Sequence, residues 1–143
     1  MLTVLLDTNV MMVALSPRSN LHWLYQALIN GQFKLVVSTE IILEYEEQLR
    51  YRYDDSVVTD FLLILAEAVN VVHQKSHFKW NLIIADPDDN KFVDACISSA
   101  ADYLITHDKH FDVLKQNNFP LVNIIDAYAF EKILQEGKLI DVQ

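Results

Sequence analysis

The sequence has a single cysteine, Cys96, among its 143 residues, so it cannot form an intramolecular disulfide bond. A chain of this kind suits a reducing compartment, and a cytoplasmic location is expected. A domain of this length buries enough surface to fold without a disulfide or a structural metal. The sequence therefore predicts one domain that spans residues 1–143.

Glycine and proline are also scarce, with two and three residues respectively, which argues against a β-sandwich rich in tight turns. Long hydrophobic runs are missing. The longest candidate, residues 61–69, is interrupted by Glu67 and is far shorter than the roughly 20 residues of a membrane span. The first residues contain no basic region and include an early Asp7, so neither a signal peptide nor a membrane partner is expected.

Basic residues are few, with 11 Lys and Arg against 20 Asp and Glu, and the formal net charge is −9. Proteins that bind nucleic acid usually carry a basic footprint. One interpretation is that the acids gather in a site for divalent cations, which would reverse the local charge. The other interpretation is that the protein does not bind nucleic acid. Some basic residues are partly grouped and could contact phosphates. They are Arg50, Arg52, Lys75, Lys79, Lys109 and Lys115.

Short apolar runs alternate with helical patterns along the chain. The expected strands span residues 3–6, 33–37, 71–73, 103–106 and 121–125. The expected helices span residues 9–15, 20–29, 38–51, 54–70, 89–100, 110–116 and 126–137, whereas residues 74–84 show no clear pattern. Such alternation, with strand runs that are apolar throughout, predicts a parallel sheet covered by helices on both faces. The expected fold class is α/β, a three-layer α/β/α sandwich with a central, mostly parallel sheet.

Residues able to cap helices mark several of the expected boundaries. The expected N-terminal caps are Asn20, Ser38 or Thr39, Asp89 and Asp126. The expected helix stops are Gly31 and Gly137.

Four acidic residues fall at positions that the expected sheet brings to one edge. Ligands of open parallel sheets bind at the carboxyl ends of the strands, and Asp7 and Asp108 lie at two of these ends. Glu44 and Asp94 lie on helices that begin near such ends. Clustered carboxylates repel one another and need a cation or a proton. Oxygen ligands without cysteine favour Mg²⁺ or Mn²⁺, and a pair of such ions suits in-line attack of water on a phosphodiester.

Each acid also has a purely structural interpretation. Asp7 is an ordinary turn residue at a strand end, and Asp108 could simply begin a loop. Helical spacing does not choose between Glu44 and Glu46, since both border the apolar stripe of their helix. The prediction depends on the coincidence of positions rather than on any single acid.

Four motifs in the same order resemble those of the PIN-domain family, and the resemblance covers residues 3–127. The segment VLLDTNVMMVAL looks like the first motif, and VVSTEIILEYEEQL is similar to the second, in which Glu44 precedes an aromatic residue. The segment DPDDNKFVDACISSAADYLITHDKHFD resembles the third and fourth, with Asp94 matching the helical acid and Asp108 ending the Thr-x-Asp. The DPDDNKF stretch is similar to a subgroup of toxins from toxin–antitoxin pairs, in which Asp89 is a secondary site candidate.

This resemblance implies a metal-dependent ribonuclease that cleaves single-stranded RNA, binds an antitoxin and forms a homodimer. The expected catalytic and metal-binding residues are Asp7, Glu44, Asp94 and Asp108, and the cofactor is Mg²⁺ or Mn²⁺. Asn9 and Thr106 are expected to orient these carboxylates through hydrogen bonds.

Two other functions compete with this prediction. A non-catalytic module that kept the fold and binds a partner protein would explain the negative charge. A phosphotransfer enzyme with an aspartyl nucleophile at Asp7 would need a second Asp two residues later, where Asn9 stands, and a nearby glycine, whereas the first is Gly31.

Overall fold

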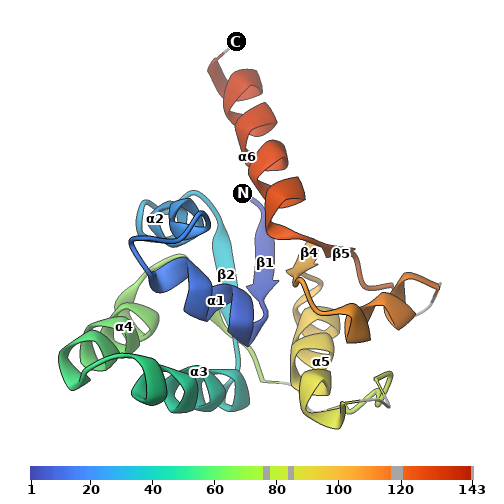
Figure 1. Cartoon of the computed structure of the whole chain (residues 1–143). Helices are drawn as coiled ribbons and strands as arrows, with labels where there is room; N and C mark the ends of the chain where they lie inside the picture. The colour runs from blue at the N-terminus through green and yellow to red at the C-terminus, as the bar shows by residue number, and fades with distance from the viewer. Residues whose placement is uncertain (76–77, 84–85, 117–120, 143) are drawn as a thin grey trace.

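The computed structural model describes residues 1–75, 78–83, 86–116 and 121–142 (Figure 1). Its strands form one parallel sheet in the order β3-β2-β1-β4-β5. The strands are β1 (Thr3–Leu6), β2 (Lys34–Val37), β3 (Val71–His73), β4 (Tyr103–Ile105) and β5 (Ile124–Ile125). The α-helices are α1 (Thr8–Leu15), α2 (His22–Ile29), α3 (Thr39–Arg52), α4 (Asp55–Glu67), α5 (Asn90–Ser99) and α6 (Ala127–Val142). Two 3₁₀ segments, η1 (Pro87–Asp89) and η2 (Lys109–Gln116), flank α5 and β4.

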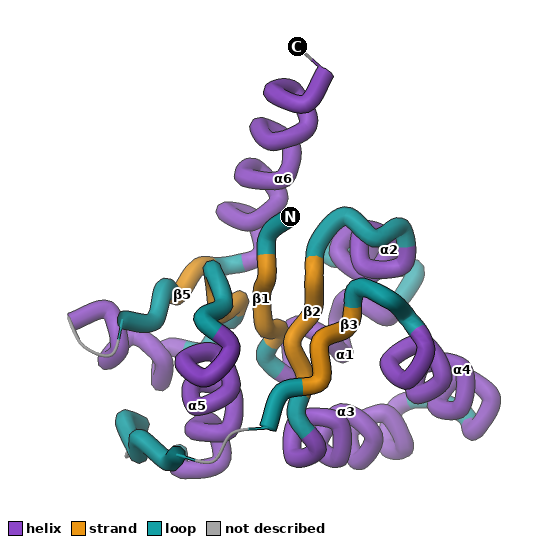
Figure 2. Tube along the Cα trace, turned by 180° about the vertical axis from the view of Figure 1, so that it is seen from behind, coloured by secondary structure: helices purple, strands orange, loops and turns teal. Residues whose placement is uncertain are grey.

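Helices cover both faces of the sheet, which confirms the predicted α/β sandwich. Figure 1 shows α1 in front of the strands, and the reverse view in Figure 2 brings α5 to the front. Helix α5 contacts β1, β2 and β4. The side chains of Val4, Leu5 and Leu6 on β1 are fully buried, as expected for a central strand with helices on both sides. Within the described residues, none of the helices combines the length and the apolar character that crossing a bilayer requires.

Several helix boundaries follow the predicted capping residues. The Ser38 hydroxyl accepts a hydrogen bond from the Ile41 amide at 3.2 Å, and the Asp126 carboxylate accepts one from the Ala129 amide at 2.8 Å. Gly31 ends the α2 region in the left-handed conformation, with φ of 72°. The prediction for Asn20 was wrong, because α2 begins after Leu21 without a side-chain cap.

Two predictions near the C-terminal end were also wrong. Of the strand expected at residues 121–125, only Ile124–Ile125 pairs with β4, and residues 117–120 lie outside the described ranges. Helix α6 continues through Gly137 to Val142 instead of ending there. A glycine inside a helix costs only about 1 kcal/mol, so it ends a helix only where the chain also turns into the left-handed conformation.

Ala100, which ends α5, adopts the left-handed conformation with φ of 53° and ψ of 40°. This conformation costs a residue with a Cβ roughly 1–2 kcal/mol, and glycine carries no such cost. We expect Ala100→Gly to raise the free energy of unfolding by about 1 kcal/mol, measured by urea denaturation. The control Ser98→Gly, at an exposed position inside α5, should lower it by a similar amount. A destabilised Ala100→Gly variant would contradict this prediction.

Candidate metal centre

Asp7 and Asp108 are brought together by the pairing of β1 with β4. Leu6 pairs with Ile105, so the residues that follow both strands meet at the carboxyl edge of the sheet. The Thr106 hydroxyl donates a hydrogen bond to Asp7 Oδ2 at 2.7 Å and accepts one from the Asp108 amide at 3.0 Å. This one hydroxyl fixes the Asp7 carboxylate and holds the backbone of Asp108 next to it.

The Asp7 carboxyl is buried, with 6% of the residue exposed. Burial raises the pKa of Asp7, and the nearby Asp108 and Glu44 carboxylates raise it further against the lowering effect of the Thr106 hydrogen bond. A buried carboxylate beside two others favours the approach of a proton or a cation.

Glu44 reaches Asp7 because its neighbour Tyr45 anchors α3. The fully buried Tyr45 donates its hydroxyl hydrogen to the carbonyl oxygen of Leu6, the last residue of β1. The Thr8 hydroxyl then donates to Glu44 Oε2. Helical spacing left Glu44 and Glu46 as alternatives, and in the structure Glu46 instead pairs with Arg50 at 3.1 Å. Sequence reasoning missed the role of Tyr45, although the family motif marks an aromatic residue at its position.

A lysine lies against this carboxylate. Lys91 Nζ is 2.7 Å from Glu44 Oε1, and its side chain is only 15% exposed. The positive charge offsets part of the repulsion among the acids. Sequence reasoning missed this pair as well, because no spacing rule relates a residue of α5 to a residue of α3.

Asp89 occupies the N-terminal cap position of α5 but makes no capping hydrogen bond. Its Oδ2 atom is buried and accepts no hydrogen bond from any residue in the described ranges. Burial, followed by the charges of Asp86, Asp7 and Asp108, raises the pKa of Asp89 to about 7. His110 Nδ1 lies 3.8 Å from Asp89 Oδ2 and 3.6 Å from Asp108 Oδ1. The predicted cap therefore faces the acids at the ends of β1 and β4.

Asp94 lies among different groups. Its Oδ1 atom accepts a hydrogen bond from the Trp80 amide at 3.1 Å. Burial and the Glu40 charge raise the pKa of Asp94, and Lys79 lowers it. Asp94 lines a separate hollow, described below, and its place in the metal site stays a prediction.

Asn9, the other predicted orienting residue, is exposed and lines a hollow beside His107 and Tyr128. The arrangement thus gathers Asp7, Glu44, Asp89 and Asp108, with Thr106 as the orienting residue.

The donors in this cluster fit a hard divalent cation. They are carboxylate oxygens, two of the acids have raised pKa values, and Asp89 Oδ2 is a buried acceptor to which none of the described residues donates a hydrogen bond. Asp86, Asp89 and His110 also offer ligand atoms that lie within 4.8 Å of one another. The acidic cluster can therefore lower its own repulsion by binding a divalent cation.

The raised pKa of Asp89 predicts how stability depends on pH without metal. The folded protein binds this proton with a pKa of about 7 against 3.8 for the free side chain, so the stabilisation that protonation gives is lost as pH rises through that range. Asp89→Asn removes this loss. Its melting temperature in EDTA should match that of the wild type near pH 4 and exceed it by a few degrees at pH 8. Equal melting temperatures at pH 8 would contradict this prediction, and the exposed substitution Asp60→Asn serves as control.

Comparison with known proteins supports this description of the fold. No curated protein matches the chain. The solved structures that resemble it include VapBC2 from Rickettsia felis bound to a promoter DNA fragment, with 14% identity over 87% of this chain and 98% of the other, and a TM-score of 0.61. FitAcB from Neisseria gonorrhoeae has 14% identity over 87% and 98% of the two chains, with a TM-score of 0.54. DNA-bound VapBC from Salmonella typhimurium has 12% identity over 89% and 99%, with a TM-score of 0.53.

The family itself is shown by the sequence match rather than by these distant structures. The profile described as PIN domain matches residues 3–110. This range contains all four acids of the cluster: Asp7 just after β1, Glu44 on α3, Asp89 at the end of η1 and Asp108 just after β4. With that match and the shared fold, this chain belongs to the PIN-domain family.

Proposed function

We propose that this protein is a Mg²⁺- or Mn²⁺-dependent endoribonuclease that cleaves single-stranded RNA. The observation that carries the proposal is the meeting of Asp7, Glu44, Asp89 and Asp108, with the buried Asp89 Oδ2 atom lacking a hydrogen-bond donor in the described residues. PIN-family membership, and the nuclease chemistry that the resemblance implies, support it. We do not include Asp94 in this proposed ligand set, because its carboxylate accepts the Trp80 amide hydrogen bond and is influenced by Glu40 and Lys79 instead.

These four carboxylates would hold one or two divalent ions. Such an ion lowers the pKa of water and offsets the charge that develops on a phosphodiester under attack. The other groups act on the ligands. Thr106 orients the Asp7 carboxylate through its hydroxyl, and Thr8 does the same for Glu44. Lys91 neutralises one oxygen of Glu44 and leaves less negative charge to repel an approaching RNA.

We also propose that the protein is the toxin of a toxin–antitoxin pair, acts in the cytoplasm as a homodimer and is blocked by an antitoxin. Two observations support this proposal: the DPDDNKF stretch resembles a toxin subgroup, and the similar solved structures are VapBC and FitAB complexes. A small reading frame next to the gene would support the antitoxin.

Metal-dependent cleavage is the test of the catalytic part. The wild-type protein should cut a labelled single-stranded RNA in Mg²⁺ or Mn²⁺ and leave it intact in EDTA, as followed on a denaturing gel. Calorimetry should show Mn²⁺ binding. Intact RNA for several sequences, together with no Mn²⁺ binding, would contradict the proposal.

That negative result would favour the second candidate, a module without catalysis that binds a partner protein. The observation in its favour is the net charge of −9, which opposes binding to phosphates.

A further inference from the structure

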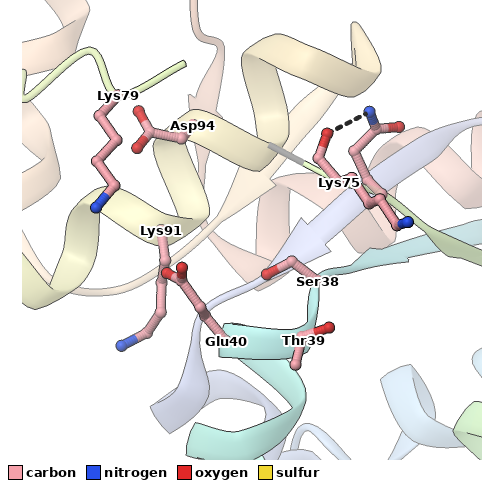
Figure 3. Close-up of a pocket in the computed structure, with 8 residues that line it drawn as sticks. Ser38, Thr39, Glu40, Lys75, Lys79, Lys91 and Asp94 are labelled. Carbon is pink, nitrogen blue, oxygen red and sulfur yellow. Dashed lines mark hydrogen bonds between the residues drawn. The ribbon is translucent and has the colours of Figure 1, made fainter. Parts of the chain in front are cut away.

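Beside the acidic cluster lies a hollow of about 320 Å³, here called the lysine hollow (Figure 3). Its lining includes Thr39, Glu40, Lys75, Lys79, Lys91 and Asp94. We propose that the lysine hollow binds the phosphate backbone of the single-stranded RNA next to the cleaved bond, with a base stacking on Phe78. This inference rests on the proposed ribonuclease function and adds where the substrate lies.

The position of the hollow follows from the sheet. Ser38 and Thr39, which line it, directly follow β2, and Lys75 lies two residues after β3. The acids Asp7 and Asp108 follow the adjoining strands β1 and β4. Both sites therefore lie along one carboxyl edge, and Lys91 joins them because it lines the hollow and pairs with Glu44. An RNA strand that follows this edge passes from the acids to the lysines.

The charge of the hollow differs from that of the whole protein. Three of the chain's 11 basic residues line it, although the net charge is −9. Figure 3 shows Lys79 and Lys91 on one side of the hollow and Lys75 on the opposite side. Lys75 and Lys79 are exposed, and neither forms an ion pair within the described parts of the chain. The two acids that line the hollow are Glu40 and Asp94, so its lysines outnumber its carboxylates by one.

Aromatic side chains accompany the lysines on the same segment. Phe78 is 61% exposed, and its ring centroid lies 4.7 Å from that of Trp80 in an edge-on arrangement. Proteins that bind single strands combine lysines for the phosphates with aromatic rings on which bases stack. The order Lys75, Phe78, Lys79, Trp80 supplies both kinds of group within a few residues.

Asp94 holds this segment in place. Its carboxylate is buried and accepts the hydrogen bond of the Trp80 amide, which ties residues 78–80, with Phe78 and Lys79, to α5. We therefore assign Asp94 as a positioning residue for RNA binding.

Fluorescence anisotropy with a labelled oligoadenylate tests the inference. All proteins carry Asp7→Asn so that the RNA stays intact in Mg²⁺. Lys75→Ala with Lys79→Ala should weaken binding roughly 20-fold at 0.1 M salt and reduce the slope of log affinity against log salt by about 1.4. Phe78→Ala should weaken binding of oligoadenylate roughly tenfold and leave binding of an abasic oligomer unchanged.

The matched control is Lys34→Ala with Lys132→Ala, which removes the same charge from exposed positions on β2 and α6 outside the hollow. It should bind as the parent does. Equal losses in both double variants would overturn the inference, as would no loss in either. No RNA binding by the parent would overturn it too.

The cleavage assay keeps the two proposals apart. If wild-type protein fails to cleave RNA in Mg²⁺ or Mn²⁺, yet Lys75→Ala with Lys79→Ala selectively loses RNA binding, the lysine hollow stands and the nuclease fails.

Discussion

Asp7→Asn should lower the rate of RNA cleavage in Mg²⁺ by more than about 100-fold, because even residues that only orient metal ligands contribute 10–100-fold. The substitution removes the negative charge at the centre of the cluster, where Asp108 and Glu44 also raise the pKa of Asp7. It keeps an oxygen that can accept the Thr106 hydrogen bond. The fold should therefore persist, and circular dichroism and the melting temperature should show no loss of structure.

The matched control for Asp7→Asn is Asp60→Asn, which removes a carboxylate from an exposed position on α4. This control should cleave as the wild type does and bind Mn²⁺ equally well in calorimetry. An Asp7→Asn protein with wild-type cleavage would refute the proposed site, whatever its metal affinity.

The second large effect distinguishes two acids of the DPDDNKFVDA segment, Asp89 and the buried Asp94. Asp89→Asn should also lower cleavage by more than about 100-fold, since its carboxylate faces Asp7 and Asp108. Asp94→Asn should lower it less than about tenfold, because the new carboxamide oxygen can still accept the Trp80 hydrogen bond.

Calorimetry with Mn²⁺ shows whether each of the two substitutions acts through metal binding. Asp89→Asn should weaken Mn²⁺ binding, and Asp94→Asn should leave it unchanged. The reverse order of the two variants, in either cleavage or Mn²⁺ affinity, would place Asp94 in the metal site and Asp89 outside it.

The residues that follow β1 and β4 are the part of the site that the sequence alone predicts best. Asp7, Thr106 and Asp108 could be placed at one edge because short apolar runs mark the strands, and a parallel sheet aligns their carboxyl ends. The helical angle alone does not decide whether Glu44 or Glu46 is the site residue. The family motif chose Glu44, and the Tyr45 hydrogen bond to Leu6 gives the physical reason for its position.

The surroundings of the Asp89 and Asp94 carboxylates could not be predicted from the sequence. An aspartate before a helix normally caps it, so the local sequence predicts Asp89 as a cap, and only the family resemblance marks it as a secondary site candidate. In the structure its carboxylate makes no capping bond. Asp94 borders the apolar stripe of α5, but a position on a helix gives only its angle. Which neighbour it meets depends on the residues 78–83, whose path has no periodic pattern to predict it.

Helix α6 has a practical consequence for handling the protein. It runs past the amino end of β1 and away from the body of the domain, as both views show. The acids lie at the carboxyl end of that strand. A surface, dye or carrier protein attached through the last turn of α6 is therefore held on the far side from the acids, and leaves the RNA-facing edge open for measurement.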